Sequence, residues 1–199
     1  NSMYTHDVSG TDDTAQFNTA YGFAAMDAIT TGDQNTAVGY AAGGALTTGT
    51  GNVSLGYRAG LSLTTGHNNV AIGNNALLTE DGDGYNVAIG ASALKDLNAG
   101  ADAYNVAVGH AAGENVSTGV QNTLIGGLAG DALTSGDNNV VLGYNAMSSA
   151  DGSESRNIAI GSNTLAAMNS SDWNYNVAIG FNAGTAVTTG VQNTIIGGL

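Results

Sequence analysis

Short apolar stretches of the form Asn-x-Ala-Ile/Val-Gly recur along the chain at a nearly constant spacing. The eleven repeats begin at Asn18, Asn35, Asn52, Asn69, Asn86, Asn105, Asn122, Asn139, Asn157, Asn176 and Asn193. Successive Asn residues lie 17, 17, 17, 17, 19, 17, 17, 18, 19 and 17 residues apart. A period this short predicts units that cannot bury an apolar face alone and must stack on their neighbours. We therefore expect an all-β parallel β-solenoid of about eleven coils, each with two short strands and two turns.

Side chains should alternate between the two faces of the strand that follows each Asn. In the coil that begins at Asn35, Thr36 and Val38 should point one way and Ala37 the other. Aliphatic residues recur at the position of Val38: Leu55, Ile72, Ile89, Val108, Ile125, Leu142, Ile160, Ile179 and Ile196. Because parallel strands stack at about 4.8 Å, these residues should form a continuous column. We expect this column to be the core.

The opposite strand face is also apolar, although its side chains are smaller. At the position of Ala37 it carries Ala71, Ala88, Ala107, Ala159 and Ala178, with Ser54, Leu124, Val141 and Ile195. Strands that are apolar on both faces are usually covered on both. A thin coil has one interior, so the second face should pack against other copies of the chain. We predict a homotrimer with these alanines near its axis.

A Gly ends each repeat strand, and Gly39 is one example. Gly permits the positive φ that a tight corner requires. A second strand should follow, carrying Leu46 and its equivalents Leu63, Leu97, Leu133 and Val187. The Asn that opens each repeat should either stack into a side-chain amide ladder or hydrogen-bond its own turn.

A longer period of about 71 residues lies over the coil repeat. The sequence GVQNTLIGGL at 119–128 returns as GVQNTIIGGL at 190–199. Residues 1–17 lack the repeat and should form an N-terminal cap or a flexible segment. Residues 18–199 should form one solenoid domain, which we interpret as a fragment of a longer protein.

Composition excludes several classes of partner. Net charge is −13, and the only basic residues besides the histidines are Arg58, Lys95 and Arg156. Nucleic-acid binding requires clustered Lys and Arg, so we expect none. No apolar stretch is long enough to cross a membrane, which argues against membrane insertion. The chain has no Cys, so thiolate chemistry is excluded.

Candidate chemistry is sparse. The acidic corner at 80–84 could supply oxygen ligands to calcium. It matches no established calcium-loop pattern, however, so we interpret it as a solvated loop. His6, His67 and His110 do not share a repeat position, so a row of metal ligands is not expected. No Ser, His and carboxylate pattern suggests a catalytic set. We therefore expect no catalytic residues, no metal or cofactor and no enzymatic activity.

Aromatic residues recur at the coil corners. Tyr40, Tyr57 and Tyr144 follow the strand Gly, and Trp173 lies in one of the long coils. These rings could stack on one another as a stabilising ladder. Alternatively, they could form a sugar-stacking surface, which makes the four residues candidate glycan contacts.

The repeat sequence resembles those of two protein families. NVAIG-x-x-A, as at 69–76 and 86–93, resembles the head repeats of trimeric autotransporter adhesins. The sequence NTAVGY-x-AG-x-x-LTTG at 35–49 is similar to repeats of phage tail fibres that end in an endosialidase-type chaperone domain. The resemblance implies a left-handed, trimeric β-roll that is extracellular, on a virion tail fibre or a bacterial surface.

The function expected from these features is that of a structural and binding segment of an extracellular fibre, which attaches to a cell-surface glycan or protein. Two alternatives stay open. The chain could be the subunit of a self-assembling filament, because an open terminal strand can pair with another molecule. Rows of Thr, as in Thr47-Thr48 and Thr64-Thr65, could instead form an ice-binding face.

Overall fold

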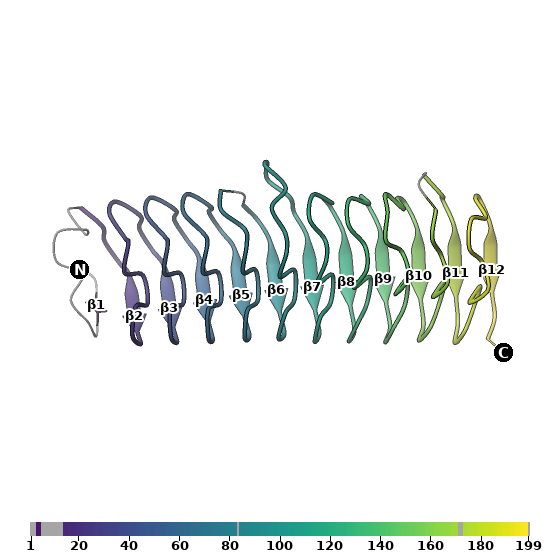
Figure 1. The fold of residues 1–199 in the computed structure, drawn as a ribbon, viewed down its shortest axis with the longest axis horizontal. Coiled ribbons are helices and arrows are strands. Elements are labelled where there is room, and N and C mark those ends of the chain that lie inside the picture. The colour runs from purple at the N-terminus through teal and green to yellow at the C-terminus, as the bar shows by residue number, and fades with distance from the viewer. Residues whose placement is uncertain (1–2, 5–13, 83, 171–172, 199) are drawn as a thin grey trace.

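The repeat sequence folds into a single parallel β-solenoid in a computed structural model that describes residues 3–4, 14–82, 84–170 and 173–198. Neighbouring coils pair in sequence order, so the strands form one twelve-stranded parallel sheet (Figure 1). The strands are β1 (Met3–Tyr4), β2 (Thr19–Tyr21), β3 (Thr36–Val38), β4 (Val53–Leu55), β5 (Val70–Ile72), β6 (Val87–Ile89), β7 (Val106–Val108), β8 (Thr123–Ile125), β9 (Val140–Leu142), β10 (Ile158–Ile160), β11 (Val177–Ile179) and β12 (Thr194–Ile196). The predicted parallel β-solenoid is confirmed.

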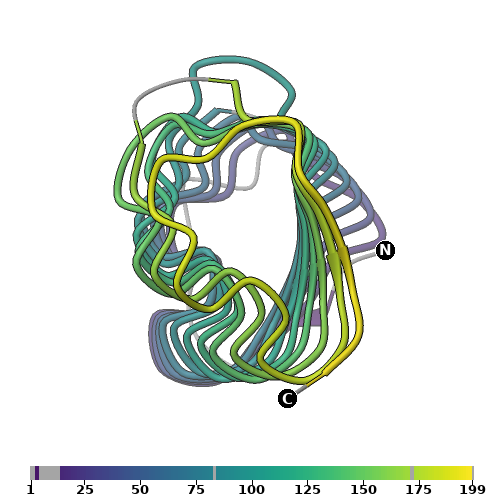
Figure 2. The same cartoon turned by 90° about the vertical axis from the view of Figure 1, so that its right-hand side faces the viewer.

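Equivalent residues of successive coils pair directly, as the period predicts: Ala71 pairs with Ala88, and Ile72 with Ile89. Figure 2 looks along the solenoid from its C-terminal end, with the chain advancing toward the viewer. Each coil runs clockwise in this view, so the solenoid is left-handed. At the other end, β1 adds a parallel strand to β2. Most of the predicted cap at 1–17 lies outside the described residues.

Only one strand forms in each described coil, so the predicted second strand is wrong. Leu46, Leu63, Leu97 and Leu133 lie in turns, although all four are buried. The physical reason is the backbone, which takes a left-handed conformation at three positions of a typical coil. In the coil of Asn86 these are Tyr85, Ser92 and Leu94, with φ of 62°, 58° and 46°. Positive φ interrupts an extended strand, so the rest of the coil is a succession of corners.

The strand Gly is required by both its conformation and its surroundings. Gly39 has a φ of 135°, and a Cβ atom built on it would lie 2.4 Å from the carbonyl oxygen of Gly56 in the next coil. The equivalent glycines of β2 to β11 meet the next coil in the same way, with Cβ-to-oxygen distances of 2.2–2.7 Å. Coils can therefore stack at strand spacing only if this position has no side chain.

The orientation of the repeat strand is opposite to the prediction. Ala71, Ala88, Ala107, Ala159 and Ala178 are completely buried inside their own chain, whereas Val38, Ile125 and Ile179 are 36–39% exposed. The prediction that the Val38 column forms the core is therefore wrong, and so is the placement of these alanines on a trimer axis.

The width of the interior explains the inversion. Large side chains from the corners, including Met26, Leu77, Leu94 and Leu165, already fill the interior and are fully buried. Small strand residues fit against them. Leu124 is a large strand residue on the inner face, and glycines at the corners of its own and the preceding coil make room for it: a Cβ would lie 3.1 Å from Cδ2 of Leu124 on Gly130 and 2.6 Å from its Cδ1 on Gly113. Around Leu124 the strand and the corners therefore compensate in volume, as close packing requires.

A ladder of buried Asn side chains holds consecutive coils together. The backbone N–H and the Nδ2 of Asn52 both donate to Oδ1 of Asn35, at 2.9 and 3.1 Å. Nδ2 of Asn52 also donates to the carbonyl oxygen of Gly66 at 2.7 Å, which ties the side chain to the closing turn of its own coil. Both alternatives that the sequence left open therefore occur together. Each repeat Asn except Asn193 is buried, so its hydrogen bonds are costly to lose.

Candidate interaction surfaces

The outer face of the sheet is uncharged and mostly apolar, with Thr at four positions of its first column. Two columns of side chains form it, one at the first and one at the third residue of each strand. The first column consists of Thr19, Thr36, Val53, Val70, Val87, Val106, Thr123, Val140, Ile158, Val177 and Thr194. The third-residue column consists of Tyr21, Val38, Leu55, Ile72, Ile89, Val108, Ile125, Leu142, Ile160, Ile179 and Ile196. We call these two columns the sheet face; neither column contains a charged residue.

The size of the sheet face is unusual for a surface left in water. Eleven coils at about 4.8 Å and strands of three residues at about 3.3 Å give roughly 500 Å². Soluble monomers rarely expose contiguous apolar patches larger than a few hundred Å². Parallel sheets are usually covered on both faces, so an exposed face without Lys or Glu also favours association with another chain. The sheet face is therefore the strongest candidate for an interface.

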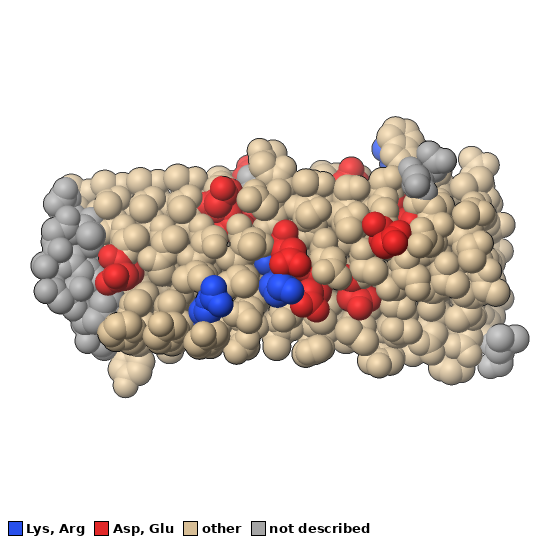
Figure 3. Space-filling model, in the orientation of Figure 1, with Lys and Arg blue, Asp and Glu red and all other residues tan. Residues whose placement is uncertain are grey.

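Charged side chains lie away from the sheet face, at the corners and on the other sides of the coil. Figure 3 shows a surface on which acidic residues outnumber the basic ones. Lys95 Nζ lies 2.7 Å from Oε1 of Glu114 and 3.6 Å from Oδ2 of Asp96. The hydrogen bond that Lys95 donates to Glu114 is the main cause of the raised pKa of Lys95. Burial raises the pKa of the Asp131 carboxyl, whose Oδ1 has no hydrogen-bond partner in the described part of the chain.

The aromatic corner residues form stacked ladders. Phe23 stacks on Tyr40 with ring centroids 5.8 Å apart, and Tyr40 stacks on Tyr57 at 5.4 Å. On the other side of the strand, Tyr85 stacks on Tyr104 at 4.9 Å. Because a stacked ring has its face covered by its neighbour, Tyr40 has no free face to offer a sugar, and Tyr57 has one face covered.

The other two candidate glycan contacts lie apart from this ladder and from each other. Tyr144 is 60% exposed beside Gly127, whose missing side chain leaves room for the ring. Trp173 lies at the opposite end of the strand, is 61% exposed and contacts Arg156. The structure thus does not bring the four predicted contacts into one site. Sequence reasoning missed Arg156, although it occupies the same repeat position as Tyr85 and Tyr175.

In the Thr-Thr pairs at 47–48 and 64–65, the first Thr is engaged within the solenoid. Oγ1 of Thr47 donates to the carbonyl oxygen of Thr64 at 2.9 Å, and Oγ1 of Thr64 donates to that of Asp81 at 2.7 Å. Thr30 and Ser117 make the same coil-to-coil bond. These hydroxyl hydrogens are committed to the next coil rather than to ordered water.

The acidic corner at 80–84 and the histidines do not form a metal centre in the described part of the chain, where no three potential ligands come together. Asp83 and His6 lie outside the described residues. His67 Nε2 lies 3.6 Å from Oδ1 of Asp102, and the His67 ring meets the Tyr85 ring edge-on.

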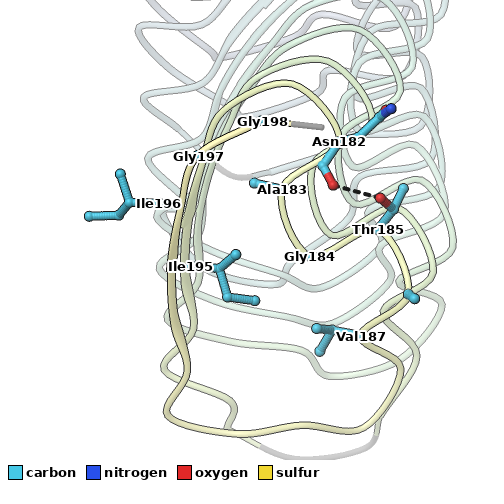
Figure 4. A pocket seen from close by; sticks show the side chains of 10 residues that line it. Asn182, Ala183, Gly184, Thr185, Val187, Ile195, Ile196, Gly197 and Gly198 are labelled. Atoms are coloured by element: carbon cyan, nitrogen blue, oxygen red, sulfur yellow. Dashed lines mark hydrogen bonds between the residues drawn. The ribbon is translucent and has the colours of Figure 1, made fainter.

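A cavity of about 470 Å³ opens at the last described coil, between β12 and the corner 182–187 (Figure 4). Ile195 points into it and Ile196 points away from it (Figure 4), as the equivalent residues of β2–β11 point inward and outward. Its wall is the same apolar interior that neighbouring coils cover elsewhere in the solenoid. The cavity therefore exposes core packing rather than a set of converging polar groups.

Comparison of the chain with family models, curated proteins and solved structures found no match. No helix capable of crossing a membrane occurs among the residues that the structure describes.

Proposed function

We propose that this chain is a structural and binding segment of an extracellular fibre, on a phage tail or a bacterial surface, and that three copies associate through the sheet face. The observation that carries the proposal is the uncharged, mostly apolar surface over β2–β12. Attachment to a cell-surface glycan or protein would then use the corners, which stay exposed in such an assembly.

A three-fold arrangement suits the two columns of the sheet face. Each chain can turn one column toward each of its two neighbours. The ring then closes, and no chain is left with its sheet face uncovered. The estimated sheet face of roughly 500 Å² is shared between two neighbours, about 250 Å² each, so the flanking corners must add to each contact for it to reach the roughly 800 Å² per partner of a standard stable interface. The resemblance of the repeat sequence to trimeric adhesin heads and tail fibres supports the same assembly.

Light scattering tests the assembly directly. A trimer of 19.7 kDa chains should return about 59 kDa at micromolar concentration. The double variant Ile72→Glu, Ile89→Glu places two carboxylates on the sheet face and should return the monomer mass. The matched control Thr31→Glu, Asn98→Glu adds the same charge at exposed corners and should keep the trimer. Circular dichroism should show that both variants stay folded, because none of the four positions is in the core.

A monomeric wild-type chain would overturn the proposed assembly, and a mass of about 39 kDa would replace it with a face-to-face dimer. A mass that grows with concentration and follows no closed ring would favour the filament alternative. Release of oligosaccharides from a bacterial polysaccharide, abolished by changing a single Asp or Glu, would contradict a purely structural and binding role. The ice-binding alternative has less support, because the Thr47 and Thr64 hydroxyls are bonded to the next coil and the row of exposed Thr48 and Thr65 is interrupted by Gly82 in the following coil.

A further inference from the structure

The two 19-residue coils, between β6 and β7 and between β10 and β11, project furthest at one edge of the solenoid (Figure 1). They are four coils apart and correspond to each other in the 71-residue repeat. The second coil carries Trp173, the only Trp of the chain. The equivalent positions of the first long coil carry different side chains. The first coil therefore serves as an internal comparison for the second.

Buried polar groups fix the backbone of the second long coil. Glu154 is fully buried, and its Oε1 accepts a hydrogen bond from the backbone N–H of Ser170 at 2.5 Å. Asn174 is also fully buried, and its backbone N–H donates to the carbonyl oxygen of Ser155 at 3.2 Å. Ser155 forms an isolated parallel bridge with Trp173. The exposed indole therefore projects from a backbone that the neighbouring coil holds in place.

Arg156 connects this indole to a second ring. Its guanidinium carbon lies 4.0 Å from the centroid of the Trp173 ring and 5.4 Å from that of Tyr175. Nη1 donates to the Tyr175 hydroxyl oxygen at 2.6 Å. In the described part of the chain, no other side-chain hydrogen bond engages the guanidinium and no carboxylate lies within 4.0 Å of it. Lys95, by contrast, is neutralised by Glu114.

We propose that Arg156, Trp173 and Tyr175 bind a glycan through a sugar ring that carries a carboxylate. Among the described residues only Tyr175 accepts a side-chain hydrogen bond from the guanidinium, and a planar guanidinium can hold a carboxylate with two parallel hydrogen bonds. Trp173 and Tyr175 are 61% and 44% exposed and offer apolar ring surface to the sugar. The inference rests on the proposed attachment function and names the ligand class.

A sugar with a single carboxylate fits better than a nucleic acid. The net charge of −13 opposes a polyanion with one charge per nucleotide, and Arg156 is the only basic residue of this edge. The equivalent edge of the first long coil has Tyr85 and Asp102 in place of Arg156 and Trp173. There Tyr85 stacks on Tyr104, and Asp102 would repel an anion. The second long coil alone should therefore bind the acidic sugar.

Because the chain has one Trp, intrinsic fluorescence reports on the proposed site in the intact protein. Galacturonic acid, whose ring carries a single carboxylate, should change the Trp173 emission in a saturable way. Its methyl ester keeps the ring and removes the charge, so it should bind at least tenfold more weakly. Arg156→Gln should weaken galacturonate binding at least tenfold, whereas Arg58→Gln removes an equal charge elsewhere and should leave it unchanged. Trp173→Ala should also weaken binding. Because this variant lacks the fluorophore, its affinity is measured by calorimetry.

Several outcomes would overturn the inference. They are the absence of binding to the wild-type chain, equal affinity for the acid and its ester, or equal losses in Arg156→Gln and Arg58→Gln. Tighter binding of a single-stranded DNA oligonucleotide would replace the sugar with a nucleic acid. Light scattering on the same samples separates the two proposals, because a trimer that ignores the acidic sugar contradicts the inference and leaves the fibre assembly standing.

Discussion

The substitution Asn105→Ala tests whether the buried amide ladder holds the coils together. Oδ1 of Asn105 accepts the backbone N–H of Asn122 at 2.9 Å, and its Nδ2 donates to the carbonyl oxygen of Gly119 at 2.8 Å. Ala can replace neither bond. The N–H of Asn122 and the carbonyl of Gly119 would both stay buried without a partner. An unsatisfied buried group costs about 1–3 kcal/mol, so the substitution should destabilise the fold by about 2–6 kcal/mol.

Thermal unfolding followed by circular dichroism measures this loss. For a chain of this size 1 kcal/mol lowers the unfolding midpoint by about 2–4 °C, so Asn105→Ala should lower it by roughly 10 °C. All proteins should be compared at one concentration, because self-association contributes to apparent stability.

The last repeat Asn provides a matched control for Asn105→Ala. Asn193 is only partly buried, and its Nδ2 donates to Oδ1 of Asn176 at 2.9 Å. Its Oδ1 accepts no bond from a described residue, so Asn193→Ala should cost about 1 kcal/mol. Equal losses in the two variants, or a loss below about 1 kcal/mol in Asn105→Ala, would refute the ladder as the main polar link between coils.

Two further substitutions test the steric role of the corner glycines and the burial of the Asp131 carboxyl. Gly90 and Gly100 both have positive φ, but only a Cβ at Gly90 would meet the next coil, at 2.2 Å from a carbonyl oxygen. Gly100→Ala should therefore cost about 1–2 kcal/mol from conformation alone, and Gly90→Ala distinctly more in urea unfolding; similar losses would contradict the steric argument. Burial raises the pKa of Asp131 in the folded state, so its charge opposes folding once the pH exceeds the ordinary value of 3.8. Asp131→Asn should increase stability at pH 7 and lose this advantage below about pH 3.8; a constant difference across that range would contradict the assignment.

The sequence by itself determined the repeat, the register between coils and the need for Asn and Gly at fixed repeat positions. The Asn spacing predicted which residues pair between coils, and Ala71 does pair with Ala88. The recurring Gly predicted a corner with positive φ, which the structure shows at Gly39. These features follow from local geometry, because stacking identical units places equivalent residues directly above one another.

Only the tertiary structure decided which face of each strand is inside. Alternation separates Ala88 from Ile89 without giving a direction, since both are apolar, and hydrophobicity alone favours Ile in the core. The interior is already filled by large corner residues such as Leu94, so the smaller side chain faces inward. Trp173 and Arg156 show the same limit. Their repeat positions differ, and only the path of the 19-residue coil, fixed by buried Glu154 and Asn174, brings the two side chains together. Packing volume and loop path depend on the whole coil, and a one-dimensional pattern does not contain them.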